Sequence, residues 1–161
     1  MRCSAALGVG HHSSAVGPIR ADVLLALPVR LHGISLGRPV DVLLDRAELR
    51  AVGLDVLCGD KIHRFLPFAT AAISDDEIMI RSPLVLLEED ELAFYRARTF
   101  ALATLRGQAV EHARRMVGPL VDVAIARDGT ISEVIVGADG AEKRIPFDDS
   151  VRLGPISRSA A

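Results

Sequence analysis

The chain has 161 residues, half of them hydrophobic, and a formal net charge of −2. Basic and acidic residues number eight and nine up to Ile80, and eleven and twelve beyond it, so neither half has the basic footprint of a domain that binds nucleic acid or anionic lipid. Aromatic residues are limited to five Phe and one Tyr, which predicts an aliphatic core in one ordinary domain or two very small ones.

The N-terminal part of the sequence predicts a tail rather than a signal peptide. Its first apolar run is weaker than the core of such a peptide, so we expect residues 1–20 to form a tail. The longest apolar stretch, residues 23–29, is far shorter than the roughly 20 residues of a membrane-spanning helix. Cys3 and Cys58 do not form a CxxC motif, so a reducing, cytoplasmic setting is expected.

A pattern of short strands occurs twice in the chain. Residues 37–44 (GRPVDVLL) recur at 118–125 (GPLVDVAI), and residues 66–68 (LPF) recur at 145–147 (IPF). The first pair is 81 positions apart (37 to 118) and the second 79 (66 to 145), as a small difference in one loop would produce. The sequence therefore predicts a tandem repeat of one small β-rich module.

The second copy is predicted to be an antiparallel meander. Residues 121–126 alternate in polarity, as in a half-buried strand. Asp-Gly pairs at 128–129 and 139–140 are typical of hairpin turns. They delimit a return strand over residues 131–136 and a third strand over 142–145.

The first copy follows the same plan with less regular turns. Val40, Val42 and Leu44 are expected to share one face of its first strand. Further strands are predicted at residues 49–57, 61–66 and 78–80.

Between the copies the pattern becomes helical. Ser82 followed by Pro83 is a typical helix start, and we expect one or two short helices over residues 83–98. The predicted organisation is a tail (1–20), a first module (21–81), a helical linker (82–99), a second module (100–155) and a tail (156–161).

The repeated Gly before a Val-Asp-Val strand, followed by a hairpin and a Pro-Phe pair, resembles the PRC-barrel family. The resemblance covers residues 24–81 and 101–154. It implies an all-β fold: two small antiparallel PRC-type β-barrels in tandem, joined by a short helical spacer. Members occur in the cytoplasmic part of the photosynthetic reaction centre H subunit and at the C-terminus of a ribosome maturation factor. The sequence departs from both, because it predicts no membrane helix and repeats the module.

Candidate catalytic and metal-binding residues do not form a recognisable site. Cys58 and His63 are close in sequence, but no motif supplies a third orienting group. His11 and His12 lack further ligands at a fixed spacing. The acidic residues of 75–77 and 88–91 do not match a calcium-binding loop. We therefore expect no enzymatic activity, no cofactor and no metal.

Four residues are candidates for interaction. Asp41 and Asp122 recur at matched strand positions, either as interface residues or, as we favour, as acceptors for neighbouring backbone groups. Arg114 and Arg115, near His112, form the main basic cluster and are either an RNA contact or a solvated hairpin tip.

The expected function is that of a non-enzymatic protein–protein interaction or scaffold module. It would dock on a protein partner through strand edges and an apolar cleft between the barrels. The alternative is an RNA- or ribosome-associated assembly factor, although the absence of a stacking aromatic strand does not favour nucleic acid. Exposed strand edges leave homo-oligomerisation open.

Overall fold

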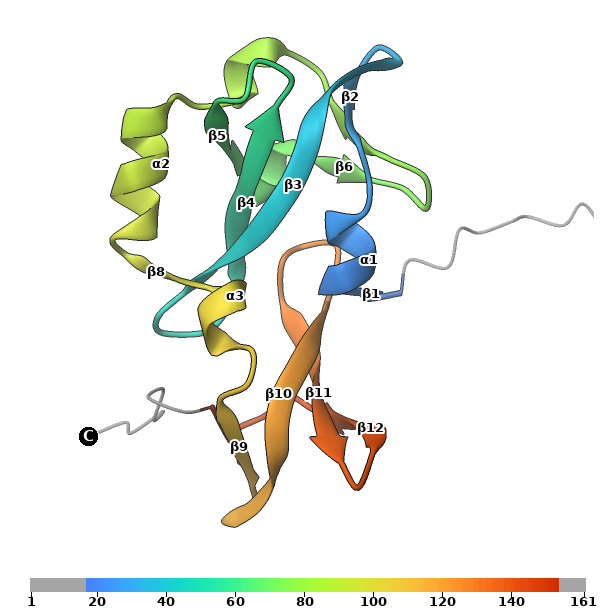
Figure 1. The fold of residues 1–161 in the computed structure, drawn as a ribbon, viewed down its shortest axis with the longest axis vertical. Coiled ribbons are helices and arrows are strands. Elements are labelled where there is room, and N and C mark those ends of the chain that lie inside the picture. The colour runs from blue at the N-terminus through green and yellow to red at the C-terminus, as the bar shows by residue number, and fades with distance from the viewer. Residues whose placement is uncertain (1–16, 154–161) are drawn as a thin grey trace, which may run out of the picture.

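The computed structural model describes residues 17–153, so Cys3, His11, His12 and the predicted tail at 156–161 lie outside the described residues. Most of the regular structure consists of strands in two sheets, which lie one above the other along the longest axis (Figure 1). Neighbouring strands are antiparallel, apart from one parallel pair. The predicted all-β class is confirmed.

The upper sheet in Figure 1 is formed mainly by the first half of the chain. Its strands are β2 (Val29–Leu31), β3 (Ile34–Asp45), β4 (Ala51–Cys58), β5 (His63–Pro67), β6 (Ala72–Ile73) and β7 (Ile78–Ile80). They are ordered β5-β4-β3-β2-β7-β6. A short 3-10 helix, η1 (Phe68–Thr70), follows β5.

The lower sheet is formed mainly by the second half. Its strands are β9 (Ala109–His112), β10 (Arg115–Ile125), β11 (Ile131–Ala138), β12 (Ala141–Pro146) and β13 (Val151–Leu153), ordered β12-β11-β10-β9-β13. Both predicted Asp-Gly pairs lie at hairpin turns, and Asp139 and Gly140 have the positive φ values (51° and 78°) of a two-residue β-hairpin.

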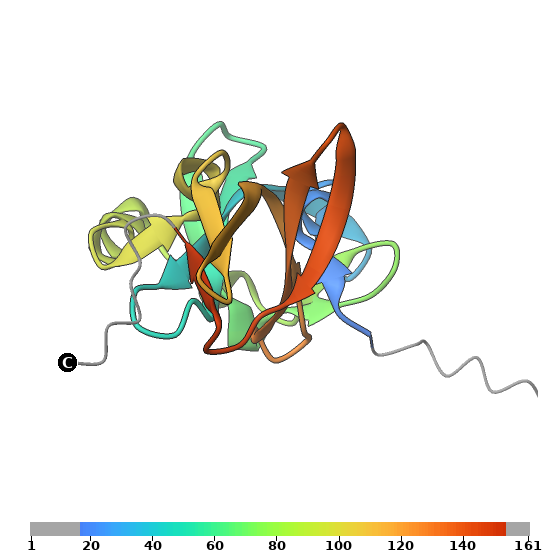
Figure 2. The same ribbon diagram turned by 90° about the horizontal axis from the view of Figure 1, so that it is seen from below.

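The expectation of two barrels needs correction, because neither sheet closes. Closure requires the outer strands of a sheet to pair with each other, and the ladders end at β5 and β6 in one sheet and at β12 and β13 in the other. β6 has two residues and β13 has three, which leaves little backbone to complete a ring. Viewed from below, the second sheet curves round the long axis as an open sheet (Figure 2).

The short segment that precedes each sheet in the sequence pairs with a strand of the other sheet. β1 (Ile19–Arg20) and α1 (Ala21–Leu25) precede the first sheet, yet β1 pairs with β10. β8 (Thr99–Ala101) and α3 (Leu102–Leu105) precede the second sheet, yet β8 pairs with β3. We call residues 19–25 and 99–105 the leading arms. Residues 19 and 20, expected within the tail, thus form a strand, because a partner distant in sequence completes their backbone pairing.

The two halves share irregularities as well as element order. Register shifts interrupt the pairing of β3 with β4 between Pro39 and Asp41 and between Leu43 and Leu44. The pairing of β10 with β11 has register shifts between Leu120 and Asp122 and between Ala124 and Ile125. These shifts lie 81 positions apart (39 to 120 and 43 to 124). Val56 lies opposite Pro39 and Val136 opposite Leu120, so β4 and β11 correspond with an offset of 80. We call residues matched in this way equivalent.

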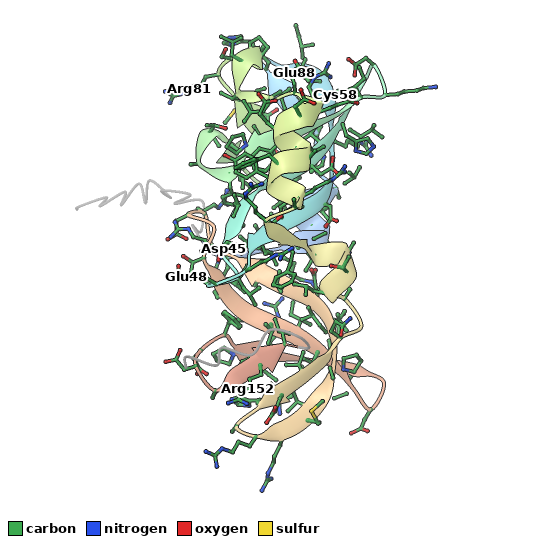
Figure 3. The ribbon with its side chains drawn as sticks, turned by 90° about the vertical axis from the view of Figure 1, so that its left-hand side faces the viewer. Asp45, Glu48, Cys58, Arg81, Glu88 and Arg152 are labelled. Atoms are coloured by element: carbon green, nitrogen blue, oxygen red, sulfur yellow. The ribbon has the colours of Figure 1, made fainter. Side chains whose placement is uncertain are left out.

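A single core joins the halves at the waist of the molecule. One continuous cluster contains Leu24 and Val42 together with Leu102, Val123 and Val134. Asp45 and Glu48, labelled in Figure 3, mark the β3–β4 turn at this waist. The halves are therefore packed into one body around a shared core.

The connection between the sheets contains two short helices and a second, smaller core. Ser82 caps the 3-10 helix η2 (Pro83–Val85), and α2 (Glu89–Arg96) follows. The helix α2 covers one face of the first sheet (Figure 3). Its residue Tyr95 stacks on Phe65 with ring centroids 4.1 Å apart.

Candidate interaction surface

Asp41 and Asp122 perform the same structural task at the waist. The Asp122 carboxylate accepts the backbone N–H of Asp22 at 3.0 Å, and the Asp41 carboxylate accepts the backbone N–H of Ala103 at 3.2 Å. Each acceptor lies in a central strand of one half, and each donor lies in the first turn of the arm helix that leads into the other half. The two carboxylates therefore hold the leading arms in place, as N-terminal helix caps do.

The surroundings of the two carboxylates differ. Asp122 is 1% exposed and pairs with Arg106 at 3.2 Å and with Arg20 at 3.6 Å. Asp41 is partly buried; burial raises its pKa, while hydrogen bonds from Ala103 and Val42 act in the opposite direction. The described contacts of both carboxylates are internal to the chain.

Arg114 and Arg115 lie far from the two aspartates, at the tip of the β9–β10 hairpin (Figure 1). Both arginines are exposed, and neither forms an ion pair within residues 17–153. Ala113 and Arg114 both adopt positive φ values, 50° and 66°. The equivalent turn of the first half contains His32 and Gly33, which also have positive φ values. The structure thus does not bring the four predicted interaction residues together.

Cys58 and His63 lie on opposite faces of the first sheet. His63 contacts Asp55 through Nδ1 at 2.8 Å, and Arg96 of α2 pairs with the other oxygen of that carboxylate. Cys58 packs in the main core and lies near the upper end of the molecule (Figure 3). Residues 55 and 58 are an odd number of positions apart in one strand, so their side chains point in opposite directions. Cys58 and His63, although close in sequence, therefore do not form a nucleophile–base pair.

The acidic runs have structural partners. Glu77 pairs with Arg30 at 3.1 Å and Asp75 with Arg127 at 4.0 Å, while residues 89–91 form the first turn of α2. Within the described part of the chain there is no group of three or more side chains suited to hold a metal ion. In the same residues no helix has the length and apolar character needed to cross a bilayer.

The space between the halves is not the expected apolar cleft, because the main core fills it. A cavity of about 520 Å³ is lined by residues 71–76 and Arg127, and one of about 280 Å³ by Glu48, Arg50, Thr130, Ile131 and Phe147. Both contain charged groups, so neither offers a continuous apolar lining.

A more apolar groove lies in the first half, beside α1. It has a volume of about 480 Å³. Its apolar lining is formed by Leu25, Leu36, Pro39, Val40, Leu57 and Cys58. Val40 is 44% exposed and Leu57 is 37% exposed. We call this surface the α1 groove.

A β-bulge explains why Val40 faces the groove. Alternation predicts that Val40, Val42 and Leu44 share one face, yet only Val42 and Leu44 are buried. Val40 is the extra residue between Pro39 and Asp41 in the pairing of β3 with β4. An extra residue interrupts the alternation, so Val40 turns outward, and this prediction was wrong for that residue.

The equivalent region of the second half is packed differently. Gly137 replaces Leu57, and a Cβ atom added there would lie 3.5 Å from the Val121 side chain. Leu120 exchanges backbone hydrogen bonds of 2.8 Å with Gly107 and Gln108, whereas Pro39 at the equivalent position has no N–H to donate. The α1 groove is therefore built by residues that differ between the halves.

No protein-family model matches the chain, and no curated protein shows significant sequence similarity to it.

Proposed function

We propose that this protein is a non-enzymatic interaction module that binds a segment of another protein in the α1 groove. We also propose that it consists of two tandem PRC-barrel-like copies. The repeated Val-Asp-Val and Pro-Phe landmarks support the repeat, as do register shifts that recur 81 positions apart (39 to 120).

The observation that carries the proposed function is the apolar lining of the α1 groove. Val40 and Leu57 remain substantially exposed there although the chain has a well-packed aliphatic core nearby. Clustered apolar side chains at a surface indicate an interaction site more strongly than single ones do.

A second candidate function, RNA- or ribosome-associated assembly, depends on the β9–β10 tip. Arg114 adopts a positive φ of 66° in a position where glycine is the favoured residue. Arg114 and Arg115 are both exposed, and guanidinium groups suit phosphate. This surface is distant from the α1 groove, so the two candidates can be separated by substitution.

The test is affinity purification from native cells with the intact chain as bait. The Val40→Asp variant places a charge in the groove, and Met116→Asp is the matched control, because Met116 is apolar, 65% exposed and located at the other end of the molecule. A defined protein partner should be lost with Val40→Asp and retained with Met116→Asp. Circular dichroism and thermal unfolding should show that both variants fold.

A different set of purified molecules would favour the second candidate function, RNA- or ribosome-associated assembly. If the bait returned ribosomal RNA with ribosomal proteins, and if their binding fell steeply with salt concentration, the assembly role would replace the interaction module. The Arg114→Glu variant should then reduce recovery, while Val40→Asp should leave it unchanged.

A further inference from the structure

The α1 groove also limits the chemistry of the segment that it binds, an inference that depends on the proposed function. Leu25, Val40 and Leu57 approach the groove from α1, β3 and β4. They offer aliphatic surface without an aromatic ring. This lining therefore suits an aliphatic side chain of the partner, whose burial would remove apolar surface from water.

The backbone around the groove is already paired, so the bound segment does not add a strand there. The Leu36 carbonyl accepts the Gly59 N–H at 3.0 Å. Gly37 is paired with Val29 on one side and Cys58 on the other. Recognition at this surface therefore depends on side chains rather than on main-chain hydrogen bonding.

Arg38 is the charged residue of the groove lining. Its exposed side chain forms no hydrogen bond or ion pair within residues 17–153. Arg20, Arg30 and Arg64, by contrast, each pair with a carboxylate of this chain. A planar guanidinium beside an apolar surface is suited to bind a carboxylate through two parallel N–H donors.

We propose that the α1 groove binds a short acidic–aliphatic segment of a partner protein. Its aliphatic side chain packs among Leu25, Val40 and Leu57, and a carboxylate one or two positions away pairs with Arg38. The aliphatic group supplies burial, and the carboxylate supplies selectivity and a dependence on ionic strength.

The test uses random dodecapeptides displayed on phage and selected on the full-length protein. Selected peptides should contain Asp or Glu next to Leu, Ile or Val. Synthetic copies of them should bind about tenfold more weakly to Arg38→Glu. Arg114→Glu is the matched control, because Arg114 is also exposed and without an ion pair in the described residues, and binding to it should change less than twofold.

A charge exchange separates pairing from a general electrostatic effect. Replacing the acidic residue of a selected peptide by Lys should weaken its binding to the natural protein and restore its binding to Arg38→Glu. Circular dichroism and thermal unfolding of Arg38→Glu and Arg38→Gln check that both variants fold. Because residue 38 is exposed, both variants are expected to retain the native fold.

The possible failures are distinguishable. Peptides that require Val40 and Leu57 but bind Arg38→Glu and the natural protein equally would overturn the acidic requirement and leave the groove as a docking site. Peptides that bind Val40→Asp and Leu57→Asp normally, or no enrichment at all, would overturn both proposals. A concentration-dependent dimer that Val40→Asp dissociates would identify a second copy of the chain as the occupant, contrary to this proposal.

Discussion

Replacing Asp122 by Ala should destabilise the protein by about 2–3 kcal/mol. The carboxylate caps the first turn of α1 through the Asp22 N–H, and loss of such a cap costs about 1 kcal/mol. It also pairs with Arg106 and Arg20, whose side chains are 36% and 22% exposed. Because solvent reaches both arginines, the cost of about 3–5 kcal/mol for breaking a fully buried pair does not apply, and we expect about 1–2 kcal/mol from this source.

The equivalent substitution Asp41→Ala is the matched control. Asp41 caps α3 through the Ala103 N–H but forms no ion pair among the described residues, so its loss should cost about 1 kcal/mol. Urea unfolding followed by far-ultraviolet circular dichroism measures both values. For a chain of this size, the loss at Asp122 corresponds to a decrease in Tm of about 4–12 °C. Equal costs for the two substitutions would refute the role assigned to the arginines.

Three further substitutions test the packing around Gly53 and the ion pair between Arg20 and Glu142. Gly53→Ala should destabilise the protein by about 1–3 kcal/mol, because the added Cβ atom would lie 2.4 Å from the Phe65 ring. Gly59→Ala is the control and should have little effect, because no atom lies within 4 Å of the Cβ added there. Equal Tm values for the two variants would contradict this packing. The hydrogen bond from Arg20 holds the pKa of Glu142 below its usual 4.5, so the stability advantage of the natural protein over Glu142→Gln should be complete above that pH and should disappear as the pH falls through the lowered value. Unfolding free energies of both variants, measured stepwise from neutral pH down through the acid range, check this sign, and an advantage that grew as the pH fell would contradict it.

Local chemistry made the second half easier to predict than the first. Asp-Gly pairs define both hairpin turns there, and the predicted strands at 131–136 and 142–145 lie within β11 and β12. In the first half a longer turn at residues 59–62 and the outward rotation of Val40 have no comparably clear sequence signal. The strand at Ile19 was missed because two residues carry no usable periodicity, and its pairing partner lies in the other half of the chain.

The candidate site was predictable only in part. Repetition in the sequence drew attention to Asp41 and Asp122, and a backbone-acceptor role was favoured for them. The identity of the donors depends on how the arms cross, which no local pattern encodes. The α1 groove arises from a bulge in β3 and from Leu57 in place of an equivalent glycine. That difference is visible in the sequence only after the two copies have been aligned through their pairing registers.

The crossing of the leading arms imposes an order on folding during synthesis. β3 and β4 are close in sequence and can pair as soon as both have left the ribosome, but Ile19 must wait for Ile125. At translation rates of roughly 5–20 residues per second, this delay is on the order of 5–20 seconds. During this time Leu24, which is fully buried in the finished protein, has no completed core to enter. Until β10 has been made, the arm therefore lacks its partner strand and the second-half residues that complete its burial.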